Sequence, residues 1–127
     1  MKWEFEDYLK VVEMSYQKMS QKEIAKIYGL SSGRIGQVLY RGYMQLKRKN
    51  RTLIADALIS LQVKKNNLIE FGNKYDFTKK LTDDIECTKS KIQKFEEAEK
   101  IFEQCGDNLI SHLKLYKILV KECSKSM

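Results

Sequence analysis

The polar segment between residues 31 and 41 carries the side chains best suited to specific contacts. Ser31, Arg34 and Gln37 recur every three residues, which places them on one face if the segment is helical. A glutamine amide can bond bidentately to adenine, an arginine to guanine or phosphate, and a serine hydroxyl to either. This spacing predicts a helix that presents hydrogen-bonding groups to base edges in a major groove of DNA.

The residues around this segment predict two short helices joined by a turn. Ser20 and Glu23 have the spacing of a capping box, in which each side chain bonds the other residue's backbone N–H. The first helix would begin at Gln21 and end at Gly29, because glycine adopts the left-handed conformation at low cost. Ser31 would cap the second helix. Two helices joined in this way form a helix-turn-helix.

The apolar residues of this segment fall where the two helices must pack together. They are Ile24, Tyr28, Leu30, Ile35 and Val38. Ala25 falls where the helices would cross most closely, and Gly42 lies on the buried side of the second helix, where it would admit a preceding helix. Apolar residues at three- and four-residue spacings predict that preceding helix over residues 2–19.

The remaining side of the second helix is the candidate DNA-binding surface. Rotation by about 100° per residue from Ile35 places Gln37, Tyr40 and their neighbours opposite the buried side. The predicted base or groove contacts are Ser31, Ser32, Gly33, Arg34, Gln37, Tyr40 and Arg41. Backbone N–H groups at a helix start, and basic residues beyond the groove, suit phosphate. The predicted phosphate contacts are Gln21, Lys22, Gly36, Lys47, Arg48, Lys49 and Arg51.

The positive charge of the chain is concentrated in the same region. Residues 20–51 hold eight basic side chains and one acidic side chain, so they account for the whole formal net charge of +7. A focused basic segment is typical of proteins that bind the phosphate backbone. On charge alone, a solvated basic surface is the alternative.

Residues 19–48 resemble region 4 of sigma-70-type factors, the module that reads the −35 promoter element. The resemblance rests on a Ser-x-x-Arg-Ile-x-Gln pattern at 31–37 and on the basic Leu-Lys-Arg ending at 46–48. It implies a helix-turn-helix that binds promoter DNA. It also implies base contacts by Ser32, Gly33 and Gln37, with Arg34 and Gly36 near phosphates.

The periodicity after residue 50 predicts further helices. The second helix continues through Arg48 and as far as Phe71, with a break near Asn50–Thr52 as an alternative to an uninterrupted helix. Phe71–Asn73 reads as a helix stop. We therefore divide the chain into a helix-turn-helix DNA-binding domain at 1–50 and a helical dimerisation or partner-binding region at 51–127.

Two long amphipathic helices are predicted in that second region. Asp76 or Thr78 would cap the first, which has about 28 residues and near coiled-coil periodicity. Its predicted apolar face is Leu81, Ile85, Thr88, Ile92, Phe95, Ala98, Phe102 and Cys105. Gly106 would end it and Asp107 would cap the last helix, whose predicted face is Leu109, Leu113, Tyr116, Val120 and Cys123, broadened by Ile110, Leu115, Ile118 and Leu119.

The fold class expected is all-α, with an N-terminal helix-turn-helix head followed by a long-helix C-terminal bundle or coiled-coil hairpin. The chain has no proline, and no run of alternating β-branched residues predicts a strand.

Composition argues against several classes of function. The cysteines at 87, 105 and 123 form no CxxC pair and there is one histidine, so we expect reduced, half-buried cysteines and no metal site. Residues 52–123 hold no paired carboxylates, no nucleophile–histidine arrangement and no phosphate-cradling glycine loop, so neither an enzyme nor a cofactor is expected. The N-terminus is not a signal peptide and the apolar stretches are short, which predicts a cytoplasmic protein without a membrane partner.

These observations predict a transcriptional regulator, of phage or mobile-element type, that binds specific double-stranded DNA sequences. We expect a homodimer formed through residues 52–123, because paired heads bind more tightly through effective concentration. The alternative is a protein–protein effector that retains a helix-turn-helix, such as an RNA polymerase-binding factor or an inhibitor of a nucleic-acid enzyme.

Overall fold

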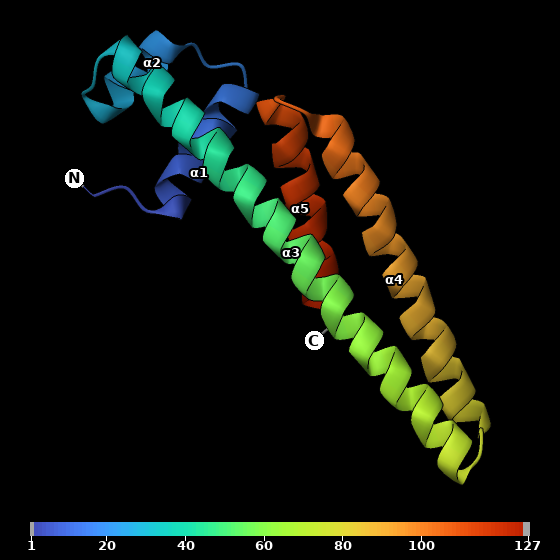
Figure 1. Ribbon diagram of the computed structural model, residues 1–127. Coiled ribbons are helices and arrows are strands. Elements are labelled where there is room, and N and C mark those ends of the chain that lie inside the picture. Colours follow the sequence, from blue (N-terminus) through green and yellow to red (C-terminus); the bar gives the residue numbers. More distant parts are fainter. Residues whose placement is uncertain (1, 126–127) are drawn as a thin grey trace.

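The computed structural model describes residues 2–125, which form five helices and no strand. In chain order these helices are α1 (Phe5–Tyr16), α2 (Gln21–Tyr28), α3 (Ser32–Tyr75), α4 (Lys79–Cys105) and α5 (Leu109–Lys125). Helix α3 runs the length of the molecule, α4 returns beside it, and α5 turns back to pack against both (Figure 1). The prediction of an all-α protein with an N-terminal helix-turn-helix is confirmed.

Side-chain caps and one glycine set the boundaries of the helix-turn-helix. The Glu23 backbone N–H donates to Ser20 Oγ at 3.2 Å, which fixes the start of α2. Gly29 ends α2 with a φ of 66°, in the left-handed region. The Arg34 backbone N–H donates to Ser31 Oγ at 3.1 Å and so fixes the start of α3. The caps at Ser20 and Ser31 and the stop at Gly29 are confirmed.

Helix α1 is shorter than the helix predicted over residues 2–19. It spans 12 residues, and Trp3 precedes it. The Trp3 ring nevertheless belongs to the core of this region, since its centroid lies 5.5 Å from the ring centroids of both Tyr8 and Tyr28. The apolar pattern extended beyond the helix because an ordered, non-helical segment also buries its side chains.

Helix α3 is continuous over 44 residues, so the break considered near Asn50–Thr52 does not exist. Asn50 is fully buried, and its Nδ2 donates to the backbone oxygen of His112 at 2.9 Å. A buried side-chain amide can lie inside a helix when it has a hydrogen-bond partner, which α5 provides here. The sequence alone shows three consecutive polar residues at this point, which is why a break was considered. Phe71–Asn73 is likewise no helix stop, because Gly72 is buried within α3 beneath the ring of Phe77.

Helices α4 and α5 follow the predicted pattern with four corrections. Every residue of the predicted α4 face is buried or partly buried, and Thr78 caps the helix by accepting from the Leu81 N–H. Asp107 does not cap α5. The Ser111 N–H donates instead to Asn108 Oδ1. Val120 is 40% exposed, Ile118 is 51% exposed and Cys87 is also exposed, so none of the three belongs to the buried side.

Three apolar clusters divide the molecule into parts that share α3. The head comprises α1, α2 and α3 as far as residue 50, and its core contains Ile24, Ala25, Ile35 and Val38. The arm comprises α3 from residue 51, α4 and α5, and its core contains Ile54, Leu61, Ile92, Phe95, Ala98, Cys105, Leu115 and Leu119. Between them, the junction cluster joins Val12 of α1, Leu46 of α3 and Leu113 of α5.

Two features are absent from the described residues. No helix there is long and apolar enough to cross a membrane. Residues 2–125 also hold no group of three or more His, Cys, Asp or Glu side chains that could bind a metal ion.

Gly42 admits α1 to the surface of α3, as its position on the buried side predicted. A Cβ atom at residue 42 would lie 2.9 Å from Val12 Cγ2 and 3.6 Å from Tyr8 Cβ. Such a contact is too close, and the β-branched valine has little freedom to move away.

We therefore expect Gly42→Leu to destabilise the protein by about 1–3 kcal/mol through overpacking. Gly33 provides the matched control, since space around its Cβ position is open. Gly33→Ala should stabilise by about 0.5–1 kcal/mol through helix propensity. Urea unfolding followed by circular dichroism measures both, and an unchanged midpoint for Gly42→Leu would refute close packing of α1 on α3.

Candidate nucleic-acid interface

The first turns of α3 present one buried side and one exposed side. Ile35 and Val38 are 0% and 2% exposed and pack into the head core. On the opposite side Gln37 is exposed and Tyr40 is 66% exposed. Of the predicted base or groove contacts, Ser31, Gly33, Arg34, Gln37, Tyr40 and Arg41 are exposed and Ser32 is partly buried. The helix therefore offers a free surface where the sequence predicted base contacts.

Two of these side chains are hydrogen-bonded to each other. Arg34 Nη1 donates to Gln37 Oε1 at 3.2 Å. The bond uses one of the five guanidinium N–H groups and leaves both amide hydrogens of Gln37 available as donors. The bond therefore brings the two long side chains together on the exposed side of α3, where both keep free donors.

The start of α2 lies against the same turn of α3. A Cβ atom at Gly36 would come within 3.4 Å of Gln21 Oε1, while Gln21 and Lys22 are themselves exposed. Free N–H groups at a helix N-terminus favour an anion. The start of α2 and the first turns of α3 thus form one continuous surface with an anion-compatible edge.

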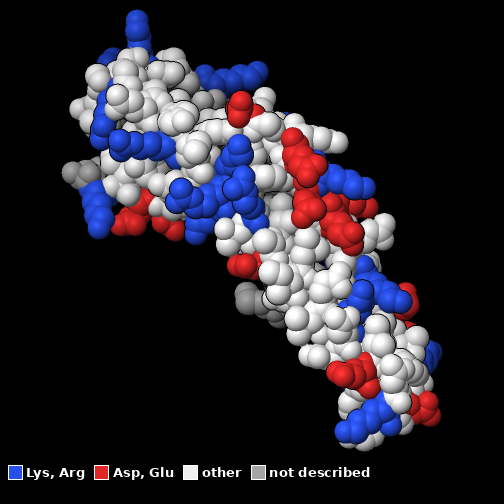
Figure 2. Space-filling view, viewed as in Figure 1, with Lys and Arg blue, Asp and Glu red and all other residues white. Residues whose placement is uncertain are grey.

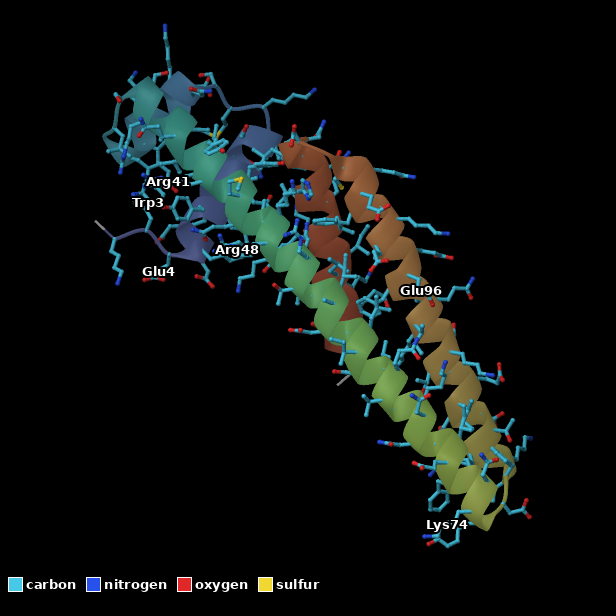
Figure 3. All side chains as sticks on the ribbon, in the orientation of Figure 1. Trp3, Glu4, Arg41, Arg48, Lys74 and Glu96 are labelled. Carbon is cyan, nitrogen blue, oxygen red and sulfur yellow. The ribbon has the colours of Figure 1, made fainter. Side chains whose placement is uncertain are left out.

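The four basic residues farther along α3 do not share one face. Lys49 Nζ lies 5.2 Å from the ring centroid of Phe5 in the head, whereas the Arg51 guanidinium lies 5.7 Å from that of Phe102 on α4. Lys47 Nζ is 5.8 Å from the centroid of the Tyr43 ring. Arg48 is exposed and lies with Arg41 on the side of α3 away from α4 (Figure 3). Only Arg48 clearly continues the exposed side of the first turns.

Charge is distributed unevenly over the molecule. Figure 2 shows basic side chains over the head and the adjoining part of α3, and acidic side chains over the upper part of α4. The acidic residues of that segment are Glu96, Glu97, Glu99 and Glu103. This separation favours approach of a polyanion to the head and disfavours its contact with α4.

A hydrogen-bonded group below the exposed surface was not predicted from the sequence. Tyr43 Oη donates to Asp107 Oδ1 at 2.9 Å, and this bond raises the pKa of Tyr43. His112, fully buried, places Nε2 3.0 Å from the Gly106 oxygen. The Tyr43 bond holds the α4–α5 turn against α3, and the His112 contact holds the turn against α5. Tyr43 and Asp107 lie more than 60 residues apart in the sequence, so no local sequence pattern could predict that they are hydrogen-bonded.

A comparison with protein families finds a match to this segment. Residues 7–48 match the family model described as sigma-70, region 4, which is a family of helix-turn-helix DNA-binding domains. The matched segment covers α1, α2 and the first turns of α3, and it includes the exposed surface described above. No curated protein and no solved structure matches the chain significantly.

The cap at Ser31 is the local bond that fixes where α3 begins. We expect Ser31→Ala to destabilise the protein by about 0.5–2 kcal/mol, because the Arg34 N–H loses its acceptor. Ser60→Ala is the control, since Ser60 is an exposed residue in the middle of α3. Chemical denaturation should show a lower midpoint for Ser31→Ala alone, and equal midpoints for the two variants would contradict a capping role.

Proposed function

We propose that this chain is a transcriptional regulator that binds specific sequences of double-stranded DNA, with the first turns of α3 in the major groove. The observation that carries the proposal is the exposed Arg34–Gln37 pair on a capped helix, within the segment that matches sigma-70 region 4. A bare basic surface would explain affinity for phosphate, whereas a fixed guanidinium–amide pair on such a helix suits the reading of base edges.

The proposed contacts fall into two groups. The base or groove contacts are Ser31, Ser32, Gly33, Arg34, Gln37, Tyr40 and Arg41. The phosphate contacts are Gln21, Lys22, Gly36, Lys47, Arg48, Lys49 and Arg51. The start of α2 is the best supported of the second group, since it adjoins the exposed surface of α3.

We also propose that the protein acts as a homodimer formed through the arm. A single helix-turn-helix offers few base contacts, and pairing two heads raises affinity through effective concentration. The arm supplies the remaining surface of the molecule and is closer to neutral than the head, because its basic and acidic side chains nearly balance. Because α3 belongs to both parts, an arm-to-arm contact would also fix the orientation of the two heads.

Salt dependence tests the contact with phosphate. For wild type on a mixed-sequence duplex, log K should fall linearly with log salt, with a slope of about −0.9 for each phosphate neutralised. Lys22→Gln should reduce the magnitude of that slope by about 0.9. Lys79→Gln, at the far end of the arm, should leave it unchanged. Fluorescence anisotropy measures both slopes, and equal slopes for wild type and Lys22→Gln would remove the α2 N-terminus from the interface.

Sequence preference tests the contacts with bases. Duplexes selected from a random pool by the wild-type protein should share a short motif. The double variant Arg34→Ala, Gln37→Ala should lose preference for that motif, because each good bidentate pair contributes about 1–3 kcal/mol of discrimination, while its circular dichroism spectrum stays unchanged.

A retained preference in the double variant would contradict the proposed docking. Absence of any duplex binding, even at low salt, would favour the alternative of a protein–protein effector, such as an RNA polymerase-binding factor, that retains a helix-turn-helix.

A further inference from the structure

We propose that a second copy of this chain packs antiparallel against the exposed side of α3, about a two-fold axis beside Ile59. The proposal specifies the homodimer proposed above. Only its consequence for DNA, given below, rests on the proposed DNA-binding function.

An apolar stripe runs along the exposed side of α3 in the arm. Ile59 is 65% exposed, Val63 is 54% exposed, and Ala55 is also exposed. These residues are four positions apart, so they lie nearly in line along one side of the helix. The small Ala55 on one side of Ile59 and the larger Val63 on the other would complement each other if two copies met with opposite directions.

The polar residues beyond this stripe are arranged symmetrically about Ile59. Thr52 and Asn66 lie seven residues before and after it, and Arg48 and Glu70 lie eleven residues before and after it. All four are exposed. An antiparallel pairing therefore places Arg48 opposite Glu70 of the partner subunit, twice in each dimer. A parallel pairing would oppose arginine to arginine and glutamate to glutamate, which is unfavourable.

The surface around Arg48 can receive the partner's carboxylate. A groove of about 430 Å³ is lined by Gln45, Arg48, Lys49 and Thr52. In the antiparallel register the partner's Glu70 enters this groove, where Arg48 and Lys49 supply positive charge and Gln45 an amide donor. Figure 2 shows a mostly uncharged stretch on the visible face of the arm, between the basic head and the charged tip of the α3–α4 hairpin.

The register has a consequence for DNA if the proposed function holds. Gln37 and Arg41 lie on nearly the same side of α3 as Ile59, as expected from about 100° per residue. In the antiparallel register the end of the partner's α3 lies opposite Tyr43, so base contacts in the dimer would come from residues nearer the start of α3 than Arg41. The two-fold axis would then turn the DNA-contacting surfaces of the two heads in opposite directions. Gln37 is 22 residues from the axis, or about 33 Å along each helix, which separates the two Gln37 residues by about 66 Å. Such a dimer would hold two separate duplex segments. The gain from effective concentration would then arise only where both segments belong to one DNA molecule that bends back on itself.

Sedimentation equilibrium of the full chain tests whether the apolar stripe around Ile59 forms the dimer interface. Wild type should dimerise, and Ile59→Asp should raise the dimer dissociation constant roughly tenfold or more, because a central apolar contact is lost and two carboxylates are opposed. Ile118→Asp is the matched control, since Ile118 is 51% exposed but lies on α5. A wild type that stays monomeric, or an Ile59→Asp variant that dimerises like wild type, would overturn the proposal.

Charge exchange and crosslinking test whether the two α3 helices of the dimer run antiparallel. Arg48→Glu and Glu70→Arg should each weaken the dimer, and the combined variant should restore it. In a Cys87→Ser background, which removes an exposed thiol, oxidation should join Ala55→Cys chains to Val63→Cys chains. Ala55→Cys chains alone should not crosslink, because the antiparallel register separates them by about 12 Å. Efficient crosslinking of Ala55→Cys to itself would show a parallel dimer and refute the register.

DNA bridging separates this inference from the proposed function. An immobilised duplex should retain a second, labelled duplex only through wild type, and Ile59→Asp should bind duplex without retaining the second one. A protein that dimerises as proposed but binds no duplex would overturn the proposed function and leave the dimer intact. A protein that binds duplex as a monomer would overturn the proposed dimer and leave the proposed function intact.

Discussion

The uninterrupted backbone of α3 is the constraint on which the rest of the structure depends. One helix of 44 residues carries the exposed Arg34–Gln37 pair in its first turns and contributes to the arm core in its second half. In a continuous helix each residue is rotated by about 100° and shifted by about 1.5 Å relative to the one before it. The position of a residue at one end therefore determines the position of a residue at the other end. The orientation of the arm is thereby tied to the surface that would meet DNA.

Packing at the junction protects this continuity at the point where the sequence looks weakest. Leu46 is buried with Val12 of α1 and Leu113 of α5, so all three helices meet one turn before the polar triplet at residues 50–52. Asn50 then donates to the backbone of α5, and Tyr43 ties α3 to Asp107 after α4. An isolated helix of this polarity would depend on propensity alone, whereas here tertiary contacts stabilise it. The head and the arm are consequently joined by a core as well as by a covalent chain.

The sequence was most informative where short-range chemistry decides structure. The caps at Ser20 and Ser31, the left-handed Gly29 and the close approach at Gly42 were all predictable, because each depends on a few neighbouring residues or on one helical face. The predictions failed where a contact with a residue distant in the sequence determines the structural role of a residue. Asn50 suggested a break and Asp107 suggested a cap, but their partners lie on other helices. The orientation of Lys49 and Arg51 also depends on rings from α1 and α4, which no spacing along α3 reveals.

The central claim is that the first turns of α3 and the start of α2 form the surface that binds duplex DNA. Its most direct test is a map of backbone amide chemical shifts in the full chain while a mixed-sequence duplex is added at low salt. We predict that the largest changes fall at residues 21–22 and 31–41, with smaller ones at 47–51 and none centred on α4. Changes centred on α4 and α5, or no change at residues 31–41, would contradict the claim.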